Sequence, residues 1–138
     1  MATIIASLLL AVGAAMFSII KKEVILSSIG RDSQFAFYAA DTGAECALYW
    51  DLRQNKFAAT TSPWNDLTCD GQNLGPIQFT EYGTPMTFEY QPSGYCARVS
   101  VTKFEDNSTK VDARGYNTAC ITIATNPRAL ERAVELAY

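Results

Sequence analysis

Four cysteines carry the clearest chemistry in this chain of 138 residues. They stand at positions 46, 69, 96 and 120, at intervals of 23, 27 and 24 residues. Zinc ribbons and knuckles need cysteines paired at short spacing, and the absence of histidine rules out a mixed Cys/His zinc site. The intervals therefore favour disulfides over an all-cysteine metal site. Disulfides place the cysteine-bearing part of the chain in an oxidising compartment outside the cytoplasm.

Four cysteines allow three disulfide connectivities. The sequential pairing joins Cys46 to Cys69 and Cys96 to Cys120 and closes two local loops of similar length. Closing a loop of this size stabilises a fold by about 3 kcal/mol through lost chain entropy. Because the spacing suits two local loops, we predict the sequential pairing.

The remaining polar residues give little indication of catalysis. Without histidine the chain lacks the ordinary pairing of a nucleophile with a base. The neighbouring carboxylates Asp41/Glu45 and Glu105/Asp106 are better explained as solvated groups than as an acid/base pair. We expect no enzyme activity and no cofactor. The tripeptide that begins at Asn107 matches the N-glycosylation acceptor pattern, which is a short motif.

Charge and length narrow the class of protein further. The net charge is -3 and the sequence pI is near 4.8, whereas nucleic-acid binders concentrate lysine and arginine on one face. We therefore expect no nucleic-acid binding by the monomer. The length suits one domain with a modest core.

The first 20 residues contain no charge. As a helix this run would extend about 30 Å, which matches the hydrocarbon core of a bilayer. Nine strongly apolar residues lie in it, namely Ile4, Ile5, Leu8, Leu9, Leu10, Val12, Phe17, Ile19 and Ile20. A secretory signal peptide is the alternative, but its basic n-region is missing.

Lys21 and Lys22 create a conflict of orientation. They flank the apolar run on its C-terminal side, so the positive-inside rule would leave the rest of the chain in the cytoplasm. The cysteines indicate the opposite side. Both observations fit if a short basic leader preceded Met1 and was removed after it had set the topology.

The helical pattern continues without proline until Pro63, and its helix signals stop near residues 54–55. We predict one helix of about 53 residues. Gly13, Gly30 and Gly43 each disfavour it by about 1 kcal/mol relative to alanine, which favours close packing or bending at these positions. The stripe of small residues should lie against a sheet, and its packing residues are Ala36, Ala40, Gly43, Ala47 and Trp50.

The second half of the chain has β character. Residues 56–75 have the composition of a loop closed by Cys69. Short strands are predicted at 76–82, 86–91, 95–104 and 109–116, with a hairpin turn at 105–108. Residues 128–138 suit either a helix or a strand, and we favour the strand. The predicted fold is α+β: a long N-terminal helix whose C-terminal half packs on an antiparallel sheet.

Three stretches resemble type IV pilins and the related pseudopilins of secretion systems. They are the uncharged N-terminal run, the helical segment "FYAADTGAECAL", and the ending "DARGYN…PRALERAVELAY". The segment is similar to a small-residue helix signature of one pilin subgroup, with Ala39, Ala40, Gly43, Glu45 and Ala47 at the matching places. In the ending, Gly115 and Arg128 match a glycine that follows a strand and an arginine that opens the last one. Residues 55–94 match no pattern of the family.

The resemblance implies a precursor cleaved by a prepilin peptidase, with Met1 as the processed and methylated N-terminus. It also implies that the apolar half-helix moves from the membrane into a filament core. The core residues would be Ile4, Ile5, Leu8, Leu9, Val12, Gly13, Phe17 and Ile20. One departure concerns the fifth residue, which is usually a glutamate in the family and is Ile5 here. Some minor, tip-located members also lack that glutamate.

Residues 1–28 are therefore expected to form a membrane anchor and later a filament core, and residues 29–138 a globular pilin domain. The expected function is a structural subunit of a type IV pilus or similar extracellular filament. Its partners would be other copies of itself, the membrane before assembly, and the pilus assembly machinery. The alternatives are a monomeric membrane-anchored binding module outside the cytoplasm and a minor pilin or pseudopilin of a secretion or DNA-uptake system.

Overall fold

A computed structural model of the chain describes residues 2–58 and 63–138. Its contacts divide the chain into two compact units, one ending at Asp32 and the other beginning at Ser33. The predicted boundary, after residue 28, lies slightly earlier. Helix α1 runs from Ala2 to Leu48 and is followed by a π-helical turn at Tyr49–Arg53. The helical part of the chain thus ends close to the predicted position, but its last turn is wider than an α-helix.

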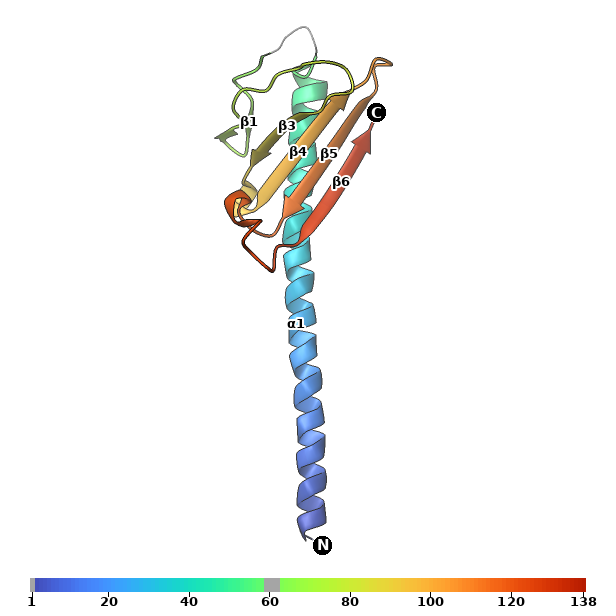
Figure 1. The fold of residues 1–138 in the computed structure, drawn as a ribbon, viewed down its shortest axis with the longest axis vertical. Coiled ribbons are helices and arrows are strands. Elements are labelled where there is room, and N and C mark those ends of the chain that lie inside the picture. The colour runs from blue at the N-terminus through green and yellow to red at the C-terminus, as the bar shows by residue number, and fades with distance from the viewer. Residues whose placement is uncertain (1, 59–62) are drawn as a thin grey trace. The chain divides into compact units, whose positions relative to one another are not determined.

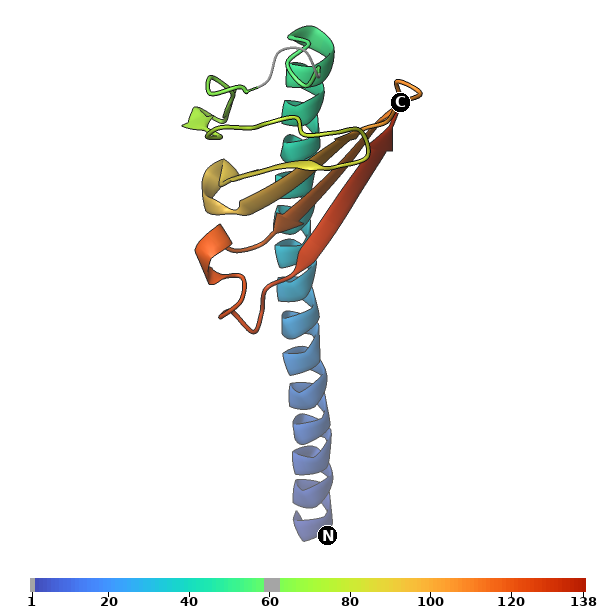
Figure 2. The same ribbon diagram turned by 45° about the horizontal axis from the view of Figure 1, so that its top comes forward.

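Four antiparallel strands form the main sheet, in the order β3-β4-β5-β6. They are β3 (Met86–Tyr90), β4 (Cys96–Lys103), β5 (Thr109–Tyr116) and β6 (Glu131–Ala137). The strands lie side by side across one side of the C-terminal part of α1 (Figure 1), and the turned view shows the same packing (Figure 2). The predicted α+β fold is confirmed, and residues 128–138 contain a strand as favoured.

The predicted turn at 105–108 connects β4 and β5. The Phe104 N–H donates to the Ser108 carbonyl, and Asn107 adopts a positive φ of 66°. The register of this hairpin places Lys103 opposite Thr109 and Cys96 opposite Tyr116. Polar turn residues and alternating flanks were therefore sufficient to predict this hairpin.

Two predictions for residues 56–82 are wrong. Residues 76–82 do not form a strand, because only Ile77 pairs, in an isolated bridge with Trp64. The expected loop at 56–75 contains a small hairpin, β1 (Thr68–Cys69) and β2 (Gln72–Asn73). Asp70 and Gly71 form its turn, with φ of 48° and 70°. Asp-Gly is a strong hairpin signal because both positions of such a turn need positive φ.

The core of the second unit lies between α1 and the inner face of the sheet. Burial alternates along β3, as expected for a strand with one face covered. The buried side chains of the sheet include Phe88, Val99, Val101, Val111 and Ala113, and the loop before β3 adds Phe57, Trp64, Leu67 and Ile77. Phe57 stacks on Phe88 with ring centroids 6.3 Å apart. The loop between the helical segment and β3 thus supplies much of the core.

Candidate functional site

The apolar part of α1 is exposed in the isolated chain. Gly13 has open space around it, and a Cβ added there would meet no atom within 4 Å. Met1 lies outside the described residues, as does the side chain of Leu8. The other predicted core residues are each at least 46% exposed, namely Ile4, Ile5, Leu9, Val12, Phe17 and Ile20.

This helix is long and apolar enough to cross a membrane, although a signal sequence would pass the same test. Burying one large aliphatic or aromatic side chain contributes about 1.5–3 kcal/mol. Because the described chain covers none of this segment, its burial requires a bilayer or other protein chains.

All four cysteines lie within the described residues and are joined in two disulfides. Cys46 of α1 pairs with Cys69 of β1, at a Cα–Cα distance of 6.0 Å. Cys96 at the start of β4 pairs with Cys120, at 4.8 Å. This is the sequential connectivity predicted from spacing. The sulfurs are therefore not available as thiolates, and the alternative of an all-cysteine metal site is wrong.

The predicted packing stripe faces the sheet. Ala36, Ala40 and Ala47 are fully buried. A Cβ added to Gly43 would lie 2.9 Å from a methyl group of Val99, so this glycine leaves room for β4. Trp50 is partly buried, and its indole N–H donates to the Thr68 carbonyl at 2.9 Å. Trp50 thereby contacts the small β1–β2 hairpin.

The two residues assigned to the family's ending lie at shifted positions. Gly115 is inside β5 rather than after it, and Arg128 precedes β6 by three residues. Gly115 nevertheless has a clear packing role, because β5 passes directly against the backbone of α1 there. A Cβ at this position would lie 2.9 Å from the Ala39 carbonyl carbon and closer still to backbone atoms of Ala36 and Ala40.

A buried charge network connects the π-helical turn after α1 with the sheet, and it was not predicted from the sequence. Lys103 donates to both carboxylate oxygens of Asp51, at 2.7 and 2.6 Å, and to the Thr109 hydroxyl at 2.8 Å. The Tyr138 hydroxyl donates to Asp51 at 2.6 Å. Asp51 is only 7% exposed, so Lys103 and Tyr138 supply the partners that a buried carboxylate requires.

Burial, and then the hydrogen bond and charge of Asp51, raise the pKa of Tyr138 well above its usual value. The phenol therefore stays protonated and continues to donate. The sequence contained a signal for this network, because Asp51 follows Ala47 by four residues and continues the buried stripe. A carboxylate on a buried helix face indicates a cation elsewhere in the fold.

The neighbouring carboxylates have ordinary surroundings. Glu45, Glu105 and Asp106 are exposed. Asp106 accepts hydrogen bonds from the hydroxyl and the backbone N–H of Ser108, which lower the pKa of its carboxyl group. These contacts explain Asp106 as a turn residue.

The glycosylation motif lies at the tip of the β4–β5 hairpin. Asn107 is exposed, but Thr109, whose hydroxyl completes the motif, is 2% exposed and bonded to Lys103. In the folded chain that hydroxyl belongs to the buried network. Modification of Asn107 would therefore have to precede folding.

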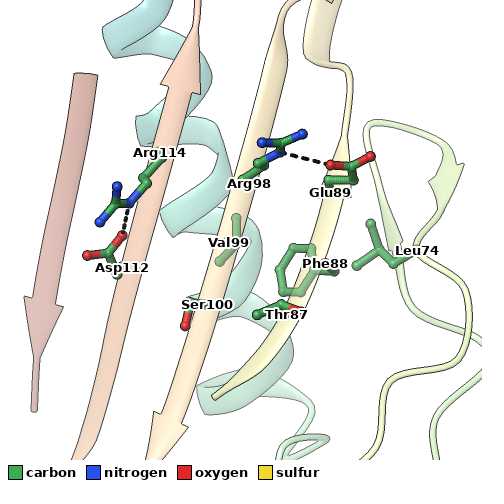
Figure 3. Close-up of a pocket in the computed structure, with 9 residues that line it drawn as sticks. All are labelled: Leu74, Thr87, Phe88, Glu89, Arg98, Val99, Ser100, Asp112 and Arg114. Atoms are coloured by element: carbon green, nitrogen blue, oxygen red, sulfur yellow. Dashed lines mark hydrogen bonds and ion pairs between the residues drawn. The ribbon is translucent and has the colours of Figure 1, made fainter. Parts of the chain in front are cut away.

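The outer face of the sheet carries a shallow groove of about 510 Å³ (Figure 3). Its arginines point toward separate acidic partners: Arg98 donates to Glu89 at 3.0 Å, and Arg114 donates to Asp112 at 3.1 Å. All four side chains are at least partly exposed, so these ion pairs contribute little to stability. The arginine and carboxylate charges of the groove compensate one another.

No family model, curated protein or solved structure matches this chain. Its function is therefore inferred from its own residues and geometry.

Proposed function

We propose that this chain is a structural subunit of a type IV pilus or pilus-like extracellular filament. It polymerises through the apolar segment of α1, and the disulfide-linked unit that begins at Ser33 supplies the rest of each subunit. The proposal assigns packing rather than catalysis to the chain. Its sequence resemblance to pilins and pseudopilins concerns both ends of the chain and agrees with this assignment.

One observation supports the proposal above the others: a long uncharged helical segment leaves its large apolar side chains exposed. Before assembly a bilayer can cover these side chains. After a subunit leaves the bilayer, the same segment of neighbouring copies can replace the lipid, because the hydrophobic effect does not depend on the identity of the apolar partner. Small residues such as Ala11, Gly13 and Ala14 allow helices to approach closely.

The α+β unit and its disulfides agree with this role. Disulfides persist outside the cytoplasm, where no reductant keeps thiols reduced, so they can stabilise a domain that is anchored there. Ala36, Ala40 and Gly43 pack the C-terminal part of α1 closely against the sheet and fix the helix within that unit. The Ile5 position separates this chain from family members that place a glutamate there, which is compatible with a minor subunit.

A monomeric membrane-anchored binding module is the second candidate. The groove on the outer face of the sheet favours it, because arginine side chains and hydroxyls are available there for a polar ligand. The compensated charges of the groove make it the weaker assignment.

The deciding experiment replaces Leu9, 68% exposed, by lysine in the full chain. Surface material is sheared from cells, sedimented and imaged in negative stain. We expect the Leu9→Lys chain to lose fibres, because a charge in an apolar helix interface is unfavourable by several kcal/mol. The matched control is Ile121→Lys, which changes an 86% exposed apolar residue of the second unit and should leave fibres unchanged. Wild-type-like fibres from Leu9→Lys would overturn the assignment of the apolar segment to the filament core, whereas absence of fibres from the wild-type chain would overturn the filament function in favour of the anchored monomer.

A further inference from the structure

The side of α1 and of its π-helical turn that faces away from the sheet carries six residues that we call the aromatic–acidic face. They are Phe37, Tyr38, Asp41, Glu45, Tyr49 and Leu52. At about 100° per residue, the four members on α1 fall on one arc of the helix, opposite the buried stripe. Tyr49 and Leu52 follow in the π-helical turn. The four apolar members of the face are between 46% and 63% exposed. A compact unit rarely leaves a run of aromatic and aliphatic side chains uncovered along a helix, so this face is suited to a protein partner.

The two acidic members of this face, Asp41 and Glu45, form no ion pair with any residue that the structure describes. Asp41 and Glu45 are four residues apart, and like charges at this spacing destabilise a helix. Every ion pair found among residues 2–58 and 63–138 uses other carboxylates. A partner that suits this face must therefore supply cations together with apolar surface.

A segment of the same chain has these properties. Lys21 and Lys22 also form no ion pair with any residue that the structure describes. The segment formed by the two lysines and Glu23 has a net charge of +1. Large apolar side chains flank it on both sides, and each is more than half exposed: Ile19, Ile20, Val24 and Ile25. No other two cationic residues of the chain are adjacent in sequence.

We propose that the aromatic–acidic face of one copy binds the Lys21–Lys22 segment of a second copy. The lysines meet Asp41 and Glu45, while the flanking aliphatic side chains cover the aromatic rings. Charges paired at the edge of an apolar interface attract more strongly than in bulk water. This inference rests on the proposed filament function and specifies which surfaces make contact within it.

The two surfaces belong to different parts of one helix, so the contact is heterologous. Each copy can offer its lysines to one neighbour and its acidic face to another, and such an interface propagates without closing. The contact also defines a stagger: neighbouring helices are offset by about 20 residues, the interval between the two charge clusters. An apolar segment alone would not define one register.

Carbodiimide cross-linking of sheared wild-type fibres tests the contact directly. This reagent joins a lysine amine to a carboxylate only where the two touch. We expect covalent dimers on a denaturing gel, and peptide mapping should find Lys21 or Lys22 joined to Asp41 or Glu45. Cross-linked dimers joined at other residues would overturn the inference.

Charge reversal tests it independently. Asp41→Lys with Glu45→Lys, or Lys21→Glu with Lys22→Glu, should lower sedimentable filament by about tenfold or more, which corresponds to about 1.4 kcal/mol. Co-expression of the two variants should restore mixed filaments, because the lysines of one variant then meet acids on the other. The control Lys110→Glu reverses a partly exposed charge that pairs with Glu135, outside both surfaces, and should leave filament yield unchanged. Each variant is first checked for membrane insertion and for both disulfides.

The outcomes separate this inference from the proposed function. If the wild-type chain forms no fibres, both are overturned. If fibres form but co-expression of folded, inserted variants recovers no more than either variant alone, the aromatic–acidic face is not the contact surface. In that case the filament function stands.

Discussion

Gly115 on β5 lies directly against the backbone of Ala36 on α1. A Cβ added to Gly115 would overlap the Ala36 carbonyl oxygen and the Ala40 nitrogen, which are main-chain atoms that no rotamer change can move aside. Gly43 on α1 faces the sheet in turn, but its nearest neighbour is the side chain of Val99. The two glycines allow the helix and the sheet to approach more closely than side chains would permit, and the cost of replacing them should differ.

Gly115→Ala should destabilise the chain by about 3 kcal/mol or more, because overpacking against rigid backbone shifts the whole element. Gly43→Ala should cost less, since the Val99 side chain can rotate. Gly13→Ala is the contrasting variant: with open space around it, alanine should stabilise the helix by about 1 kcal/mol. Thermal unfolding in detergent with the disulfides intact measures all three. Equal midpoints for the Gly115 and Gly13 variants would contradict the packing described.

Removing one member of the Asp51–Lys103 pair should be costly. Lys103→Met leaves a buried carboxylate with only Tyr138 as a strong donor, and such changes destabilise by about 3–5 kcal/mol. The double variant Asp51→Leu with Lys103→Met should recover much of the loss, because it removes both charges. Urea unfolding of the full chain in detergent gives the three values. A double variant that is less stable than Lys103→Met alone would argue that the ion pair itself is strongly stabilising.

Tyr138 gives the stability of the chain a dependence on alkaline pH. Its folded pKa is raised above the ordinary value of 10.0, so its contribution is fully present below pH 10 and is lost as the pH rises above that value. Tyr138→Phe should flatten this part of the stability curve, and the difference between the two chains should be constant below about pH 9. Unfolding free energies measured from pH 8 to 11 test this. An unchanged alkaline slope in the variant would exclude Tyr138 as its origin.

The disulfides can be mapped without reductant. Peptides should contain Cys46 joined to Cys69 and Cys96 joined to Cys120. Replacing both Cys96 and Cys120 by serine should lower stability by about 3 kcal/mol through the added entropy of the unfolded chain. A peptide linking Cys46 to Cys96 would contradict the fold, since α1 and β1 are joined in the structure.

A chain that begins at residue 29 should be soluble and monomeric. It lacks the exposed apolar run of the first unit but keeps every residue of the unit from Ser33 onward, with both disulfides. Size-exclusion chromatography and disulfide mapping check this expectation. Aggregation of the shortened chain would indicate that the second unit depends on the first for its own folding.

Local sequence patterns were sufficient to predict the elements that depend on neighbouring residues alone. The apolar run, the absence of proline before Pro63 and the alternation in residues 95–116 predict α1, β4 and β5. Cysteine spacing predicts the disulfides, because a short loop constrains its own partners. The hairpin at Asp70–Gly71 was also accessible from its turn residues, but the surrounding loop composition obscured it.

Contacts between distant segments could not be predicted from local patterns. Gly115 was assigned through a family pattern, whereas its packing role depends on how closely β5 crosses Ala36, which no sequence period encodes. The partners of Asp51 come from β4 and from Tyr138, so the sequence could indicate a buried charge but could not name its cation. For residues 76–82 a local pattern was misleading. Their apolar alternation predicted a strand, but in the structure Ile77 packs within a loop and makes only an isolated bridge with Trp64.

The two disulfides do not cross, because the first closes before Cys96 is reached along the chain. A polypeptide translocated from its N-terminal side presents Cys46 first, then Cys69, and only later the second pair. A thiol oxidase that joins each cysteine to the next one to arrive therefore produces the native bridges directly. Oxidative folding of this chain should then require no isomerase, and a cell that lacks one should still export it with correct linkages.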